Sequence, residues 1–88
     1  MQDLGTLGGT VSDASYPSTI NELGQVAGGA HTTGGDYHAF RWTATGGMQD
    51  LGTLGGTFSN APTINDRGQV AGAAYTAGGH YHAFLWTP

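Results

Sequence analysis

Two histidines lie close enough along the chain to share a metal ion. His80 and His82 are separated by one residue, so in an extended segment both imidazoles would point to one face and could bind zinc. A zinc site needs three or four protein ligands or a bound water, and no neighbouring carboxylate or third histidine completes such a set. The position equivalent to His80 in an earlier copy of the same motif holds Asp36. The sequence therefore predicts no metal site and no cofactor.

Hydrolytic chemistry is the second option that these residue types raise. Serine, histidine and aspartate all occur, but no Gly-x-Ser-x-Gly turn frames a serine nucleophile. Asp3 and Asp50 occupy equivalent positions of a duplicated motif, which favours a repeated structural hydrogen bond or turn cap over a pair of catalytic carboxylates. We therefore predict no catalytic residue and expect the protein not to be an enzyme.

Aromatic side chains offer flat surfaces on which sugar rings stack. A carbohydrate-binding hypothesis assigns these surfaces and their hydrogen-bonding neighbours to Tyr37, Tyr81, Trp42, Trp86, Arg41 and His80. The competing interpretation places each tryptophan in the packing between sheets, because it shares a strand face with a phenylalanine. Recurring positions interpreted as structural are His38, Phe40, His82, Phe84, Asn21 and Asn65.

An internal duplication determines which elements must position these residues. The segment MQDLGTLGGT at residues 1–10 recurs unchanged at residues 48–57. The later blocks Thr-Ile-Asn, Gly-Gln-Val-Ala-Gly and Tyr-His-Ala-Phe-x-Trp follow in the same order in both copies. We therefore interpret residues 1–88 as a single repeat domain, with repeat 1 at residues 1–47 and repeat 2 at residues 48–88.

The repeat is predicted to contain strands and no helix. The longest glycine-free stretch of each copy contains a proline, which disfavours helix. Segments 1–7, 17–20, 25–31 and 37–43 are predicted strands, and their counterparts in repeat 2 bring the total to eight. The Asn-x-x-Gly segments that begin at Asn21 and Asn65 predict tight hairpins, and glycine pairs at 34–35, 46–47 and 78–79 mark further reversals.

Alternation within these strands predicts a stack of similar sheets. In the strand at 37–43, Phe40 and Trp42 share one face, whereas the small Ala39 lies on the other. The strand at 25–31 carries Val26, Gly28 and Ala30 on one face and Gln25, Ala27 and Gly29 on the other, so neither face is purely polar. The aromatic side chains of one sheet could therefore fill the space above the glycines and alanines of the next, which is how propeller blades pack.

The combined motif MQDLGTLGG…IN…GQVAG…HAF-x-W, present twice, resembles the bacterial HAF repeat family. The resemblance covers nearly the whole chain. It implies β-propeller-like blades and an extracellular or cell-surface location, although no signal peptide precedes the first motif. It implies no established catalytic residue. Two copies are fewer than the family usually carries, which leaves open whether the chain is a natural short protein or an excised or designed fragment.

Two blades cannot close a ring, so the repeat predicts self-association. The segment at 1–7 has no preceding blade in its own chain, and the strand at 81–87 lacks a following MQDLGTL partner. We expect the N-terminal strand of one copy to complete the second four-stranded blade of a neighbour until a ring closes. A homotrimer would have six blades and is favoured by analogy with small two-blade lectins, whereas a homotetramer would have eight.

Composition limits the other partners. The net charge is −4 and the only basic residues are two arginines, which excludes a nucleic-acid partner. No apolar run approaches the length of a membrane-spanning helix, and no basic patch suits a membrane surface. Charged residues are only 9% of the chain, which favours contact with further copies of itself. We therefore predict a non-enzymatic structural or interaction module, with a multivalent carbohydrate-binding protein as the alternative.

Overall fold

The chain is built from β-strands throughout the part that the structure describes. In this computed structural model, residues 3–13 and 20–88 are described. Within these ranges lie seven strands: β1 (Gly8–Asp13), β2 (Val26–Thr32), β3 (Tyr37–Thr43), β4 (Gly47–Gly52), β5 (Gly55–Ile64), β6 (Val70–Thr76) and β7 (Tyr81–Trp86). The predicted all-β class is confirmed. The same residues contain no helix that is long and apolar enough to cross a membrane.

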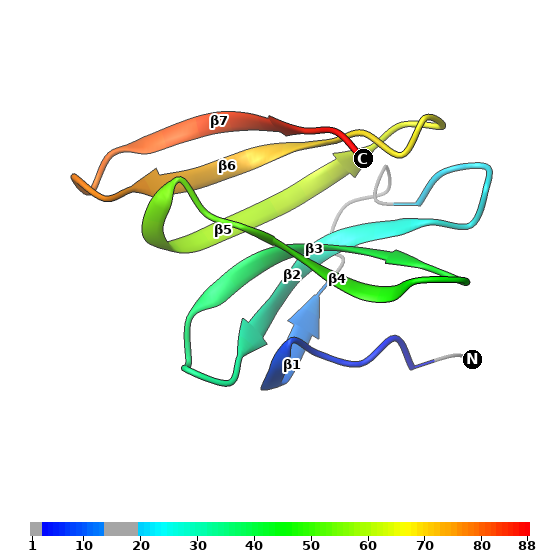
Figure 1. Cartoon of the computed structure of the whole chain (residues 1–88), viewed down its shortest axis with the longest axis horizontal. Coiled ribbons are helices and arrows are strands. Elements are labelled where there is room, and N and C mark those ends of the chain that lie inside the picture. The colour runs from blue at the N-terminus through cyan, green and yellow to red at the C-terminus, as the bar shows by residue number, and fades with distance from the viewer. Residues whose placement is uncertain (1–2, 14–19) are drawn as a thin grey trace.

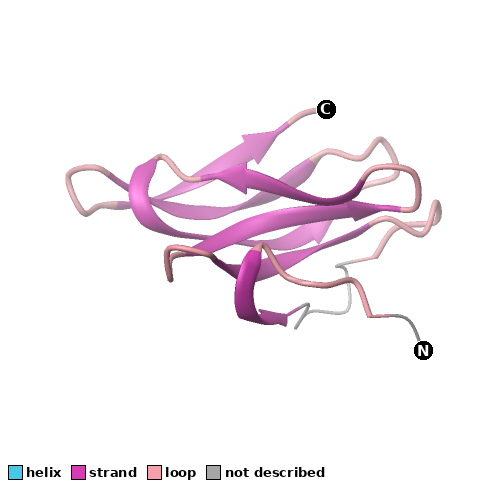
Figure 2. Cartoon of the chain, turned by 60° about the horizontal axis from the view of Figure 1, so that its bottom comes forward, coloured by secondary structure: helices cyan, strands magenta, loops and turns pink. Residues whose placement is uncertain are grey.

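The strands form two antiparallel groups, which we call the first sheet (β1 to β4) and the second sheet (β5 to β7). Neighbours in sequence pair with each other inside each group. A single parallel pair, Tyr37 in β3 with Phe58 in β5, connects the two groups into one path. Figure 1 shows β5, β6 and β7 lying above the first sheet. In Figure 2 the strands run lengthwise and the connecting loops gather at the two ends of the molecule.

Several predicted elements are confirmed. The strand predicted at 37–43 is β3, and β2, β6 and β7 begin and end within one residue of their predicted bounds. Both Asn-x-x-Gly turns form: the Gly24 N–H donates to the Asn21 carbonyl at 3.1 Å, and the Gly68 N–H donates to the Asn65 carbonyl at 3.0 Å. Gly24 and Gly68 have φ of 76° and 77°, a region that glycine enters without steric cost.

The strand predicted at 1–7 is not formed in the described part of that segment. Residues 3–6 are outside any strand, Leu7 makes one isolated bridge to Thr32, and β1 begins at Gly8. The same sequence in repeat 2 does form a strand, β4, because it pairs with β3. A strand needs a partner for its backbone groups. Residues 3–6 therefore have the sequence of a strand but no strand partner among the described residues.

The short strand predicted at 17–20 lies largely outside the described residues. Only Ile20 is described, and it makes an isolated bridge to Val26. In repeat 2 the corresponding segment is the end of the ten-residue β5 (Gly55–Ile64), which pairs with β6 along its length and contains two register shifts. Irregularities of this kind bend a strand without ending it. Residues 55–64 therefore form one bent strand, whereas the sequence predicts a strand only at the end of this range.

The core lies between the two sheets. Ala27 and Ala39 of the first sheet are fully buried against Ala61, Ile64 and Val70 of the second. Partly buried hydrophobic side chains complete the cluster: Leu51, Phe84 and Trp86. The aromatic face of the second sheet thus packs on the small-residue face of the first, as the alternation pattern predicts. Such packing brings the backbones close enough that small side chains are required on one side.

Candidate functional site

The edge of β7 is the feature that most distinguishes the second sheet from the first. β3 pairs with β2 on one side and with β4 on the other, whereas β7 pairs with β6 alone among the described residues. A free strand edge exposes a row of N–H and C=O groups, which favours addition of another extended segment. We therefore take the β7 edge and the side chains around it as the candidate site.

The contacts between β4 and β3 show what the equivalent edge of the first sheet binds. Nδ1 of His38 lies 3.0 Å from both carboxylate oxygens of Asp50. The carboxylate accepts a second bond from the Gly52 N–H at 2.7 Å. Since a carboxylate is only an acceptor, Nδ1 is the donor. The predicted structural roles of His38 and Asp50 therefore take the form of one side-chain bond that ties β4 to β3.

Arg41 contributes to the packing of the two sheets. Its guanidinium carbon lies 4.8 Å from the ring centroid of Trp86, within the range of a cation–π interaction. Its two terminal nitrogens donate at 3.4 Å, one to the Gly68 carbonyl and one to Gln49 Oε1. The sequence offered Arg41 and Trp86 as sugar-binding candidates, but in the structure they contact each other between the sheets.

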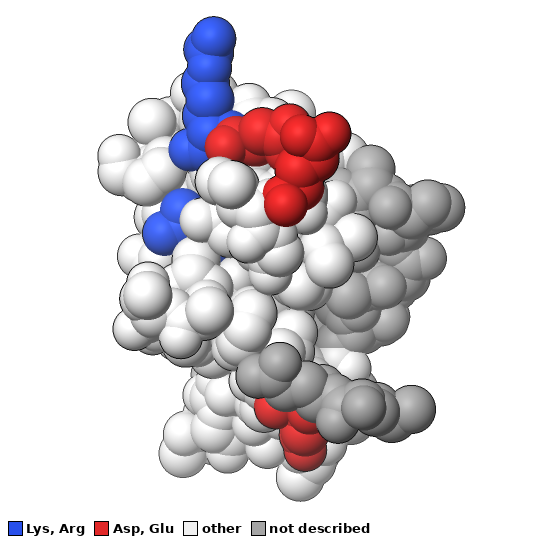
Figure 3. Space-filling model, turned by 90° about the vertical axis from the view of Figure 1, so that its right-hand side faces the viewer, with Lys and Arg blue, Asp and Glu red and all other residues white. Residues whose placement is uncertain are grey.

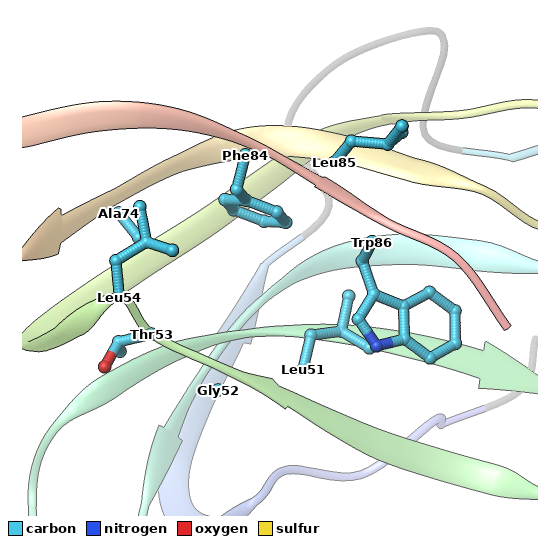
Figure 4. A pocket seen from close by; sticks show the side chains of 8 residues that line it. All are labelled: Leu51, Gly52, Thr53, Leu54, Ala74, Phe84, Leu85 and Trp86. Atoms are coloured by element: carbon cyan, nitrogen blue, oxygen red, sulfur yellow. The ribbon is translucent and has the colours of Figure 1, made fainter.

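A cavity of about 170 Å³ opens between β4 and β7. Its lining residues are Leu51, Gly52, Thr53, Leu54, Ala74, Phe84, Leu85 and Trp86. Figure 4 shows Phe84 and Trp86 pointing toward Leu51, while the Leu85 side chain projects from the opposite side of β7. The walls are mainly apolar, and no ionisable side chain lines the cavity. The cavity therefore belongs to the packing between the sheets and offers no group for acid–base chemistry.

Two of the predicted sugar-binding residues are brought into one aromatic cluster. The Tyr37 ring stacks on Phe58 at 5.3 Å, and Phe58 lies 6.3 Å from Tyr81. Tyr81 also lies 5.0 Å from Tyr75, which the sequence did not single out. Tyr75 and Tyr81 are 40% and 54% exposed, so their rings are accessible to a planar ligand. Trp42 lies outside this cluster, and it is half-buried on the other face of β3.

The remaining predicted residues have structural surroundings or lie exposed. Phe40 is buried, and Phe84 is half-buried against the core. His80 and His82 are both exposed, with ring centroids 6.4 Å apart. Within residues 3–13 and 20–88, no three His, Cys, Asp or Glu side chains are grouped as a metal would require.

The two asparagine turns are in contact with each other. Asn21 Nδ2 donates to the Asn65 carbonyl at 2.8 Å, and the Glu22 N–H donates to Asp66 Oδ1 at 3.0 Å. Each asparagine also closes its own turn, because its Oδ1 accepts from backbone N–H groups two and four residues later. The predicted structural role of Asn21 and Asn65 thus extends to a bond between repeats.

Ser59 is a buried polar residue that the sequence prediction missed. Its side chain is 0% exposed. Its Oγ accepts from the Ala39 N–H at 2.7 Å and donates to the Gly52 carbonyl at 2.5 Å, so one hydroxyl joins β5 to both β3 and β4. The sequence feature that could have identified Ser59 is its repetition, because Ser12 occupies the same position after the Gly-Gly-Thr-x segment of repeat 1.

The protein has few charged side chains that a charged ligand or partner could recognise, since they make up only 9% of the chain. The face in Figure 3 is largely uncharged, and acidic and basic side chains lie next to each other at its upper end. No family model, curated protein or solved structure matches the chain. The functional assignment therefore depends on the geometry of the β7 edge and the surfaces beside it.

Proposed function

We propose that the chain is a non-enzymatic structural module that assembles with further copies of itself into a closed β-propeller. In this proposal each sheet is a blade, and the N-terminal segment of one copy adds to β7 of the next as its fourth strand. The observation that carries the proposal is the difference between two equivalent edges: β3 is paired with β4, and β7 has no such partner among the described residues.

The second sheet exposes a face whose counterpart in the first sheet is buried. Ala27 and Ala39 are 0% exposed beneath the second sheet, but the equivalent Ala71 and Ala83 are exposed. On the same face Leu85 is 68% exposed. A cluster of exposed apolar side chains on a small protein is typical of an interaction surface. Within the chain, the second sheet covers Ala27 and Ala39. In the assembly, the equivalent face of a second copy would cover Ala71 and Ala83 in the same way.

The missing strand is expected to come from a second copy. Figure 1 shows the described part of the N-terminal segment on the far side of the first sheet, away from β7, and Figure 2 agrees. A chain that held this segment on its own β7 would have to carry it past the whole first sheet. Exchange between copies requires no such rearrangement, and repetition of the same contact closes a ring.

Ring size follows from two blades per chain. We favour a homotrimer with six blades, and a homotetramer with eight is the alternative. The resemblance of the duplicated motif to the HAF repeat family supports propeller blades and, by extension, an extracellular or cell-surface location. The low content of charged residues, 9%, suits a surface that is buried on assembly.

The mass of the chain in solution tests the proposal. Light scattering behind a sizing column, over a dilution series, is expected to give three times the 9.0 kDa chain mass, or four times for the larger ring. A folded 9.0 kDa monomer at all concentrations would overturn the proposal. Deletion of residues 1–7 is expected to give an unfolded or aggregated chain, so a soluble, folded deletion product of unchanged assembly mass would exclude strand exchange.

A second candidate function is favoured by the exposed tyrosines. Tyr75 and Tyr81 lie 5.0 Å apart and both are accessible, and tyrosine rings of this kind stack on sugars. A ring of identical chains would present such a site on each copy and bind multivalent glycans by avidity. Titration with a panel of neutral saccharides tests it: the absence of any binder at millimolar concentration in wild-type protein would exclude this function without affecting the assembly proposal.

A further inference from the structure

The bond between His38 and Asp50 has a counterpart whose two members are separated within one chain. The residues equivalent to His38 and Asp50 are His82 and Asp3. His82 is exposed on β7, and Asp3 is exposed in the N-terminal segment. The two residues occupy the positions of a bonded pair, but within one chain His82 lies on β7 and the described part of the N-terminal segment lies on the far side of the first sheet (Figure 1).

The N-terminal segment already has the local shape of the strand it resembles. Asp3 Oδ1 accepts from the Gly5 N–H at 2.8 Å, as Asp50 Oδ1 accepts from the Gly52 N–H at 2.7 Å. Gly5 and Gly52 have φ of 88° and 81°. The hydroxyls of the following threonines close matching loops, with Oγ to carbonyl distances of 2.8 Å in both copies. The Asp3 carboxylate is therefore held in the orientation that Asp50 uses to meet His38.

We infer that His82 of one copy donates a hydrogen bond to the Asp3 carboxylate of a second copy, and that this contact selects the incoming strand and fixes its register. The inference rests on the proposed assembly. By equivalence with the β3–β4 register, in which Phe40 stands opposite Asp50, Asp3 of the second copy would stand opposite Phe84. His82 would then meet it as His38 meets Asp50.

A specific side-chain bond is needed because backbone pairing alone does not define the register. A strand that slips by two residues keeps the same side chains on the same face and forms a similar set of backbone bonds. Only one position of the incoming segment carries a carboxylate, since Asp3 is followed by Leu4, Gly5, Thr6 and Leu7. A slip by two residues would therefore leave His82 opposite an apolar or neutral residue.

Ser12 supports the same arrangement independently. The equivalent Ser59 is 0% exposed and joins β5 to the Ala39 N–H and to the Gly52 carbonyl, whereas Ser12 is exposed. In the assembly Ser12 of the copy that supplies Asp3 would accept from the Ala83 N–H. Both Ser12 and Asp3 would thus contact the same strand, β7, of one neighbouring copy.

Substitution of His82 tests the inference. His82→Ala is expected to weaken each contact about three- to tenfold, the range for a partly exposed hydrogen bond to a carboxylate. A trimer contains three such contacts, so its overall association constant is expected to fall roughly 30-fold or more. Mass as a function of concentration gives this constant. His38→Ala is the matched control, because it breaks the same bond inside the chain and is expected to lower thermal stability with a smaller effect on association.

Charge exchange between two variants makes the test specific. His82→Asp places a carboxylate opposite Asp3, and the double variant Asp3→Lys/His82→Lys places ammonium groups on both sides of the contact. Each chain alone is expected to remain monomeric, whereas an equimolar mixture is expected to associate, because contacts between unlike chains pair opposite charges. Unlike chains can alternate around a ring of four but not around a ring of three, so the mixture is expected to give a closed ring if the wild type is a tetramer and open heteromers, such as a pair of unlike chains, if it is a trimer. Far-ultraviolet circular dichroism of each chain alone shows whether it is folded.

The outcomes separate this inference from the proposed function. If wild-type protein assembles and His82→Ala assembles with the same constant, the contact is wrong and the propeller proposal stands. If the two charge variants are folded but both remain monomeric when mixed, the contact is again wrong. If wild-type protein is a monomer at every concentration, the proposed function fails and the contact between copies fails with it.

Discussion

Ser59 provides the sharpest test of the packing between the two sheets. Its buried hydroxyl is bonded to the Ala39 N–H at 2.7 Å and to the Gly52 carbonyl at 2.5 Å. Ser59→Ala removes the hydroxyl and leaves the buried Ala39 N–H without an acceptor. An unsatisfied buried donor costs about 1–3 kcal/mol, and loss of the second, partly solvated bond about 0.5–1.5 kcal/mol. We therefore expect the free energy of unfolding to fall by about 2–4 kcal/mol.

This change is large for a chain of 88 residues. A domain of this size loses roughly 4–8 °C of melting temperature for each kcal/mol, so Ser59→Ala is expected to melt roughly 10 °C or more below wild type. Chemical denaturation followed by tryptophan fluorescence gives the free energy itself, provided that the slope of the transition is unchanged. All variants are compared at one protein concentration, below that at which copies associate.

Ser12→Ala is the matched control. It is the same substitution at the equivalent position of repeat 1, where the side chain is exposed, so the expected change in the free energy of unfolding is within about 0.5 kcal/mol. Equal denaturant midpoints for the Ser59 and Ser12 variants would refute the bridging role of Ser59. The contrast between identical substitutions removes any effect of alanine on strand propensity.

Two further predictions concern the turns and the closest backbone contacts. Gly72→Ala is expected to lower the free energy of unfolding by about 1–3 kcal/mol, because an added Cβ would overlap the Asn60 carbonyl oxygen. Gly78→Ala, where the nearest atoms leave room for a Cβ, is the control, and equal denaturation midpoints would contradict the close contact. Asn21→Ala is expected to cost about 0.5–1.5 kcal/mol more than Asn65→Ala, because Asn21 alone donates to the neighbouring turn at 2.8 Å. Urea titration of both variants measures the difference, and a larger loss for Asn65→Ala would show that the turns do not bond in this direction.

The sequence predicted those strands and turns that are determined by residues close together in the chain. β3 matches its predicted bounds because alternation and the flanking glycine turns define both of its ends. The hairpins at Asn21 and Asn65 were predictable because the asparagine side chain and the glycine φ together determine the turn. The stacking of an aromatic face on a small face was also readable, since it follows from the alternation of residues within each strand.

Features that depend on pairing between distant segments were not predictable in the same way. Residues 1–10 and 48–57 are identical, yet the described part of the first copy forms no strand before Gly8 and the second forms β4. The difference lies in whether a partner edge is within reach, which no local pattern records. The bond from His38 to Asp50 was missed for a related reason, because its geometry depends on a register shift between Ala39 and Phe40 in the β3–β4 pair.

The two interfaces of the proposed ring differ at the position of Arg41, which is Leu85 in repeat 2, and the difference fits their physical demands. Within the chain, Arg41 lies over Trp86; between chains, the equivalent Leu85 would lie over Trp42 of the next copy. Within the chain, the backbone joins the two sheets that form the interface. The effective concentration of one sheet near the other is therefore high, and a partly polar contact is enough to hold them together. An interface between separate chains must overcome the loss of translational freedom, and a leucine there contributes more burial of apolar surface than an arginine whose charge must stay solvated. The 68% exposure of Leu85 in a single chain is therefore consistent with a surface that becomes buried only on assembly.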